Sequence, residues 1–245
     1  MSTDNRAKCV ILGGGGHARV IIDSLRAGGI AECHGILDRD SSLWGKEILG
    51  VPVLGGDDLL PQLKGQGVTH FVVGLGGVGD NRPRRRLFEL GLKHNLTPLT
   101  VCHPAAILSP FATLGEGSVL FPAAVVNASA ILGVNVIVNT GAIVEHDCVV
   151  GDHVHIATGS RLCSTVRVGI GAHIGAGATV RQSIVIGEGA IVGAGAAVVK
   201  DVDPWMVVAG VPARVLEPWE AEVPDPASVK PSEQGPDSIT ERAIS

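Results

Sequence analysis

The sequence predicts two domains of different fold class: a small α/β domain over residues 1–105 and a parallel β-solenoid over residues 106–216. Two observations support this prediction. Up to about residue 105, apolar strand-like segments alternate with helix-like segments, as in a small parallel sheet. From residue 108 to residue 203, sixteen consecutive six-residue units all begin with Leu, Ile or Val.

The α/β segment starts with an apolar run that leads through a Gly-rich turn into an amphipathic helix ending at Gly28–Gly29. A second strand, read from CHGILDRD, ends at Asp38. The sequence THFVVGLGGVGDN indicates a third strand and its loop, followed by an Arg-rich helix from about residue 82 to residue 90. Alternating strands and helices of this length favour a parallel sheet.

The six-residue units continue without a slip, and their fifth position is always Ala, Ser, Cys, Val or Ile. A large aliphatic residue that points inward beside a small one can bury its face only by stacking on a neighbouring unit. Gly, Asn and Pro take the turns between units. The pattern therefore predicts a continuous β-solenoid with a core of aliphatic and small side chains.

Composition supports a protein built from small residues. Apolar residues make up 45% and aromatic residues only 3% of the 245 positions, with 34 glycines and a net charge of −5. This charge gives no reason to expect nucleic acid or a membrane surface as a partner, and no apolar run reaches the roughly 18 residues of a membrane helix. The five cysteines show no CxxC spacing, so we expect reduced thiols and a cytoplasmic location. Residues 217–245, rich in Pro, Ser and acids, are expected to form a disordered tail.

The Gly-rich turn matches G-x-G-x-x-A through Gly13, Gly15 and Ala18, and Asp38 follows twenty residues after Ala18. This spacing is typical of a Rossmann-like dinucleotide fingerprint. The segment is short for a complete dinucleotide fold, and no domain for hydride chemistry follows, so a nucleoside diphosphate fits better than NAD. A tight turn without a ligand remains the alternative.

The stretch VEHDCVVGDHVH, residues 144–155, holds three histidines, three acids and a cysteine in a solenoid otherwise built from Val, Ala and Gly. Imidazole titrates near neutrality, so a histidine beside carboxylates can act as a base. His153 and His155 lie two residues apart, near Cys148, which leaves a zinc site open. We expect Cys148 and Cys163 to be packing residues, and His153 and His173 to lie at the surface or an interface.

The six-residue units resemble the hexapeptide repeat of the left-handed parallel β-helix acyltransferases. The closing segment GVPARVL, residues 210–216, resembles the usual end of that domain. The combination of GGGGHA in the first domain with EHDC in the second resembles the bacterial nucleotide-sugar acetyltransferases. This resemblance implies coils of 18 residues, a homotrimer with active sites between subunits, acetyl-CoA as co-substrate, and a nucleotide-linked 4-amino sugar on UDP or GDP as acceptor.

The resemblance and the helix N-terminus together place the sugar nucleotide in the first domain. Backbone N–H groups at the start of a helix suit phosphate, and His17 could bond phosphate or sugar. Asp38 could accept from uracil or the ribose hydroxyls, and GDNRPRRR resembles the family's third substrate loop. The expected substrate-binding residues are Gly15, Gly16, His17, Asp38, Gly79, Asn81 and Arg84.

For catalysis, the resemblance implies His146 as general base, with Asp147 as the first choice and Glu145 as the second choice for the carboxylate that orients it. Asn139 could polarise or orient the acyl group. A backbone N–H near Ser164, where relatives usually carry Gly, would receive the oxyanion. The expected acetyl-CoA contacts are His155, Ser164, Ala176, Ala194, Pro212 and Arg214, and no metal is expected.

Residues 18 apart should lie one above the other, roughly 4.8 Å apart. His146 then lies beneath Ser164 and His155 beneath His173, while a further edge carries Thr140, Thr158, Ala176 and Ala194. His146 and His155 are half a coil apart and point to different sides of one chain. In a trimer, the His146 of one subunit can face the flank of its neighbour.

Three other functions stay open at this point. O-acetylation of a sugar, as in the sialic-acid branch of the family, would use the same residues on a hydroxyl. A zinc-dependent hydratase resembling the γ-class carbonic anhydrases would need a histidine-bound metal. A non-catalytic nucleotide-sugar binder would keep the Gly-rich turn but have no use for His146 between two acids.

Overall fold

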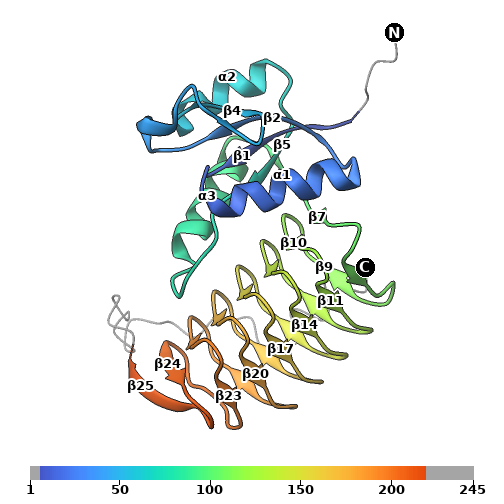
Figure 1. Cartoon of the computed structure of the whole chain (residues 1–245), viewed down its shortest axis with the longest axis vertical. Helices are drawn as coiled ribbons and strands as arrows, with labels where there is room; N and C mark the ends of the chain where they lie inside the picture. Colours follow the sequence, from blue (N-terminus) through green and yellow to red (C-terminus); the bar gives the residue numbers. More distant parts are fainter. Residues whose placement is uncertain (1–5, 219–245) are drawn as a thin grey trace.

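The structure, a computed structural model, describes residues 6–218. The expected tail at 217–245 therefore lies almost entirely outside the described residues. An α/β domain lies against one side of a long three-sided β-helix (Figure 1), and α1 and α3, which pack on opposite faces of its sheet, both contact the coils. Among the described residues, no helix is long and apolar enough to span a bilayer.

The first domain has one six-stranded sheet in the order β3-β4-β2-β1-β5-β6. All its pairs are parallel except β3 with β4. Its elements are β1 (Lys8–Leu12), α1 (Gly16–Gly28), β2 (Glu32–Leu37), η1 (Ser41–Leu43), β3 (Glu47–Ile48), β4 (Val51–Gly55), η2 (Asp57–Leu59), α2 (Leu60–Gly65), β5 (His70–Val73), α3 (Arg82–Lys93) and β6 (Thr97–Pro98).

The β-helix has three faces, each a ladder of parallel two-residue strands. The first face contains β7 (Val101–Cys102), β10 (Val119–Leu120), β13 (Ile137–Val138), β16 (His155–Ile156), β19 (His173–Ile174), β22 (Ile191–Val192) and β24 (Met206–Ala209), the last paired antiparallel with β25 (Arg214–Pro218). The second contains β8 (Ile107–Leu108), β11 (Val125–Val126), β14 (Ile143–Val144), β17 (Arg161–Leu162), β20 (Thr179–Val180) and β23 (Ala197–Val198). The third contains β9 (Thr113–Leu114), β12 (Ile131–Leu132), β15 (Val149–Val150), β18 (Arg167–Val168) and β21 (Val185–Ile186).

Strand partners on each face are 18 residues apart through the regular coils, which confirms the predicted stacking. His155, for example, pairs with His173. The first aliphatic residue and the small fifth residue of each unit together form one buried core along the β-helix axis. β7 already pairs with β10, so the first face begins before residue 106.

The two domains share a second apolar core at their junction. Side chains of α1 pack with Val101, Val119, Phe121 and Ile137, which point outward from the first face or begin its corner. The α/β domain is therefore seated on the first face, and this contact decides which surface of the β-helix stays open.

Candidate active site

His146 lies at the corner between the second and third faces, called here the His146 corner. Its Nδ1 is 2.6 Å from Oδ2 of Asp147, and about half of each side chain is exposed. Asp147 has a φ of 58°, in the left-handed region, as the tight corner requires. The carboxylate of Glu145 instead accepts a hydrogen bond from the Asn127 side chain at 2.9 Å. The structure thus pairs His146 with Asp147, the first of the two expected partners.

Residues of the next coil stand directly above this pair. The backbone N–H of Thr165 donates to the carbonyl oxygen of His146 at 3.1 Å, so Ser164 lies in the coil directly above His146, as the 18-residue spacing predicts. The backbone N–H of Ser164 makes no hydrogen bond within residues 6–218. An unused N–H one coil from an exposed imidazole can receive a developing negative charge.

Asn139 and His155 occupy a different side of the chain from His146. The Nδ2 of Asn139 is 3.1 Å from Nε2 of His155, and Nδ1 of His155 is 2.7 Å from the carbonyl oxygen of Gly77. Because a carbonyl only accepts, His155 donates from Nδ1 and accepts at Nε2. Burial, with His173 close by, lowers the pKa of His155 and keeps the ring neutral. Both ring nitrogens of this expected acetyl-CoA contact are engaged within the chain.

The expected edge of small residues is present between the first and second faces, called here the Thr140 edge. Backbone hydrogen bonds of 2.8–2.9 Å connect successive coils along it, from Gly159 to Thr140, from Gly177 to Thr158 and from Gly195 to Ala176. Ala176 and Ala194 are exposed there, as are Pro212 and Arg214 in the closing segment. Small exposed side chains in a row fit a long, thin co-substrate arm.

The Gly-rich turn at the start of α1 is fixed by a hydrogen bond to the end of β2 and is exposed to solvent. The backbone N–H of Gly14 donates to Oδ2 of Asp38 at 2.6 Å, which joins the ends of β1 and β2. Gly15 is the N-cap, and both Gly15 and Gly16 are exposed. The N-terminus of this 13-residue helix therefore presents free N–H groups and its dipole to solvent, as phosphate binding requires.

His17 follows at the same helix end but turns inward. Its ring packs on Phe121 with the centroids 4.9 Å apart, and its Nε2 is buried without a hydrogen-bond partner. Burial, with the Arg84 charge nearby, lowers the pKa of His17 to about 3. His17 is thus a neutral imidazole at the base of the turn.

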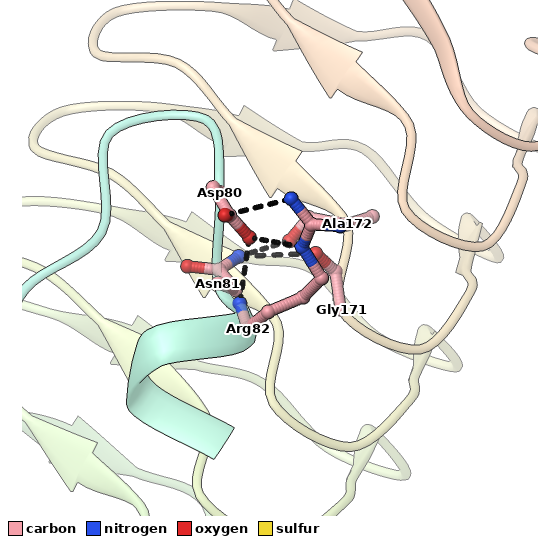
Figure 2. A network of polar contacts seen from close by, with 5 residues as sticks. All are labelled: Asp80, Asn81, Arg82, Gly171 and Ala172. Carbon is pink, nitrogen blue, oxygen red and sulfur yellow. Dashed lines mark hydrogen bonds and ion pairs between the residues drawn. The ribbon is translucent and has the colours of Figure 1, made fainter. Parts of the chain in front are cut away.

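Asn81 and Arg84 were expected to contact the nucleotide, but their side chains form hydrogen bonds that connect the two domains. Figure 2 shows that Asn81 donates from Nδ2 to the carbonyl oxygens of Gly171 and Ala172, at 3.1 and 3.0 Å. Beside it, Asp80 and Arg82 form an ion pair of 3.0 Å, and these hydrogen bonds hold the pKa of Asp80 down although burial acts to raise it. Gly79, with a φ of 80°, lets the loop turn onto the β-helix.

Arg84, the other of the two, is only 1% exposed. It donates to the Leu75 carbonyl oxygen at 2.9 Å and to the carbonyl and side-chain oxygens of Asn135 at 3.2 and 2.8 Å. Its guanidinium has no path to a nucleotide in this arrangement, so the phosphate contact expected for Arg84 is replaced by a structural role.

His153 and His173, expected at a surface or an interface, are buried beneath the α/β domain. His153 packs edge-on against Phe88 of α3, with the ring centroids 5.6 Å apart. Burial lowers the pKa of each histidine to about 4. A pocket opens beside His153 at the domain junction, lined also by Asp80, Arg85, Glu188 and Trp205. It lies at the corner between the third and first faces, away from His146.

A zinc site is not supported among residues 6–218, where no group of three or more His, Cys, Asp or Glu side chains is arranged to hold a metal ion. Cys148 is buried and donates from Sγ to the Cys163 carbonyl oxygen at 3.1 Å. All five cysteines are free thiols.

Sequence reasoning missed Trp44 and Asn135. Trp44 directly follows η1 in the loop between β2 and β3. It remains 46% exposed, although its indole N–H donates to the backbone carbonyl oxygen of Asp38 at 2.7 Å. A tryptophan six residues after Asp38, in a chain with 3% aromatic residues, was the available signal. Asn135 gave no signal, since its importance comes from a partner in the other domain.

The His146 corner and the Gly-rich turn lie on opposite sides of one chain. The α/β domain contacts the first face and the corner that holds Asn135, whereas the His146 corner is the one opposite the first face. Within one chain, the two groups of candidate site residues therefore do not meet. This arrangement, a nucleotide-type α/β domain seated on a three-sided β-helix, defines a two-domain hexapeptide-repeat acyltransferase.

Comparison with known proteins supports the assignment to this class of protein. The family model of the PglD N-terminal domain matches residues 8–90. The structure is similar to GDP-perosamine N-acetyltransferase from Caulobacter crescentus, solved with CoA and GDP-perosamine, at 40% identity and a TM-score of 0.81 over 86% of this chain and 97% of that one. It is also similar to the acetyltransferase domain of PglB from Neisseria gonorrhoeae, at 37% identity and a TM-score of 0.78 over 86% of this chain and all of that one.

WeeI from Acinetobacter baumannii is a further similar structure, at 28% identity and a TM-score of 0.76 over the same share of this chain. No curated protein sequence matches the chain. The chain belongs to the nucleotide-sugar acetyltransferases of the hexapeptide-repeat family, and its solenoid is a left-handed parallel β-helix.

Proposed function

We propose that the protein transfers the acetyl group of acetyl-CoA to the 4-amino group of a UDP- or GDP-linked 4-amino-4,6-dideoxy sugar, with His146 as general base. The observation that carries this proposal is the exposed His146–Asp147 pair, 2.6 Å apart, beneath the unused N–H of Ser164. Relatives with 37–40% identity are sugar acetyltransferases or acetyltransferase domains.

In this reaction the sugar amine attacks the acetyl thioester carbon while Nε2 of His146 takes a proton from the nitrogen. Asp147 at Nδ1 fixes the tautomer and stabilises the imidazolium that forms. The Ser164 N–H stabilises the oxyanion. The C–S bond then breaks, and the departing thiolate takes the proton from the His146 imidazolium, so that CoA leaves as a thiol. The products are the amide and CoA.

The acceptor and co-substrate need surfaces from two chains. The Gly-rich turn and Asp38 would hold the diphosphate and ribose, and the Thr140 edge, with Asn139, would lie along the acetyl-CoA arm. Since the His146 corner of the same chain lies on the opposite side, we propose a homotrimer in which the His146 of one subunit meets the sugar held by the next. Ring closure by such a heterologous interface gives three equivalent sites. We place the enzyme in the cytoplasm, where acetyl-CoA and free thiols are found.

The test is thiol release from acetyl-CoA, measured with a chromogenic disulfide against UDP- and GDP-linked 4-amino sugars. One member of the panel should turn over, and its product should keep the acetyl group in mild base, as an amide does and an ester does not. His146→Ala should lower kcat by about 10²–10⁴-fold, the range for loss of a general base. The matched control is His70→Ala, at the amino end of β5, which should keep wild-type kcat. Unchanged kcat in His146→Ala would exclude this mechanism.

A further inference from the structure

Trp44 is fixed beside the Gly-rich turn through Asp38. The carboxylate of Asp38 accepts hydrogen bonds from the Gly14 N–H at 2.6 Å and from the Asp40 N–H at 2.8 Å. The backbone carbonyl oxygen of Asp38 accepts from the indole N–H of Trp44 at 2.7 Å. One residue thus links the start of α1 to an aromatic ring that is 46% exposed. A large apolar ring that is anchored at its polar end, yet open on its surface, is suited to contact a ligand.

The order of the strands places this ring where a nucleobase would lie. In open parallel sheets the ligand binds outside the carboxyl ends of the strands, with phosphate at the first helix and ribose at the acid after the second strand. Here these positions are Gly15 and Asp38. The base must continue past β2 toward β4, the next strand of the sheet. Trp44 is in the loop between β2 and β4.

The backbone at the carboxyl end of β4 lies beside Trp44, on the other side of the position where the base would lie. The Asp38 N–H donates to the Gly55 carbonyl oxygen at 2.9 Å, so the two strand ends are joined. A Cβ on Gly56 would lie 3.4 Å from Cζ2 of Trp44, which shows that the indole borders this backbone. The next residue, Asp57, is half-buried, and burial together with the Asp38 and Asp58 charges raises the pKa of its carboxyl.

A carboxylate beside the stacked base would distinguish the two bases left open by the proposed function. Guanine presents N1–H and N2–H as adjacent donors, which a carboxylate accepts in a bidentate pair. Uracil presents one N–H between two carbonyl oxygens, which the carboxylate repels. Adenine stacks as well as guanine but lacks the pair of adjacent donors.

We infer that Trp44 is the platform on which the nucleobase of the sugar nucleotide stacks, and that Asp57 makes the site select guanine over uracil. This inference rests on the proposed function, in which the α/β domain holds a sugar nucleotide. It assigns GDP rather than UDP as the carrier of the amino sugar.

The experiment is calorimetric titration of the full chain with GDP, UDP, ADP and pyrophosphate. GDP should bind at least tenfold more tightly than UDP or ADP. Trp44→Ala should weaken GDP binding by about 10–100-fold, the range for loss of base–aromatic stacking, and leave pyrophosphate binding unchanged. Trp44→Phe, which keeps a ring, should retain most of the affinity. Asp57→Asn should weaken GDP binding about tenfold or more and leave UDP binding unchanged.

The matched control is Leu92→Ala on α3, which removes a side chain of similar exposure, 45%, from the same domain. It should bind all four ligands as wild type does. Equal binding of UDP and GDP, or full GDP affinity in Trp44→Ala, would overturn the inference while the phosphate site stands. If neither GDP nor pyrophosphate binds, the nucleotide site of the proposed function fails as well. Turnover with the sugar panel then separates that failure from a loss of the base platform alone.

Discussion

Nη2 of Arg84 lies 2.8 Å from Oδ1 of Asn135, and this hydrogen bond joins a helix of the α/β domain to a corner of the β-helix. The guanidinium also reaches two backbone carbonyl oxygens, one in each domain. Among residues 6–218 no carboxylate pairs with it, and neutral oxygens compensate the burial of its charge. A buried charge is tolerated only when it is hydrogen-bonded in this way.

Arg84→Ala should therefore lower the free energy of unfolding by about 3 kcal/mol or more, because it leaves buried acceptors unpaired and a cavity between the domains. Urea denaturation followed by circular dichroism measures this change. Arg86→Ala, on the exposed side of the same helix, is the control and should stay within about 0.5 kcal/mol of wild type. If both variants lose equal stability, the domain contact does not depend on Arg84.

Asp147 should matter for turnover far more than Glu145, although both flank His146. Only Asp147 contacts the imidazole, whereas the Glu145 carboxylate is bonded to Asn127. Asp147→Asn should lower kcat by about 10-fold or more through loss of the charge that stabilises the imidazolium, with little change in KM. Glu145→Gln keeps a group that can bond Asn127 and should keep most of kcat. The opposite order of effects in steady-state kinetics would make Glu145 the orienting residue.

Stability should fall as the solution is acidified from about pH 6.5 towards pH 4. The pKa of His17 is lowered to about 3, and those of His153 and His173 to about 4, all chiefly by burial. Between these values and the ordinary 6.5, the unfolded chain binds protons that the folded chain excludes. Acid therefore favours unfolding, by at most about 1.4 kcal/mol per pH unit for each histidine.

Denaturant titrations at pH 7.5, 6, 5 and 4.5 measure this dependence. His173→Gln removes one of the groups and should reduce the slope below pH 6.5 while leaving the curve flat above it. A slope that is the same in the variant and in wild type would show that His173 is protonated in the folded protein.

The β-helix was predictable from the sequence because its contacts repeat. A residue meets the one 18 positions away, so the pairing of His155 with His173 and the row from Thr140 to Ala194 follow from counting. The contacts between the α/β domain and the β-helix do not repeat along the sequence. Arg84 lies in a run of arginines, and only the neighbouring β-helix corner decides which of them is buried. The burial of His153 and His173 beneath the α/β domain was unpredictable for the same reason, since it depends on where that domain docks.

In the site, the spacing of the repeat correctly places Ser164 in the coil above His146. The hydrogen bond between Gly14 and Asp38 was not predicted. The sequence marks Trp44 as a rare aromatic residue close after Asp38, but no residue pattern records the bond to a backbone oxygen that fixes its ring. Asn81 and Arg84 were assigned to the nucleotide because of the loop motif in which they lie. In the structure their polar side chains bond to the β-helix, which the fold places against that loop.

Two inactive variants should restore activity to each other if each active site takes its halves from neighbouring chains. His146→Ala removes the base but leaves the nucleotide half intact. Gly15→Glu places a carboxylate at the N-terminus of α1, where it repels phosphate. A Cβ there meets nothing within 4 Å and the backbone is extended, so the fold should tolerate the change. Each variant alone should be inactive.

Co-expressed in equal amounts, the two chains form mixed trimers. An interface is competent when the chain that supplies His146 carries Gly15→Glu and the chain that supplies the nucleotide half carries His146→Ala. Random assortment gives about a quarter of the wild-type number of sites over all trimers, and each mixed trimer, as a heterologous ring, keeps about a third. Thiol release from purified mixed trimers, with tags that select them, measures this fraction. Activity that stays at the level of the single variants, in trimers confirmed to be mixed, would place both halves of each site on one chain.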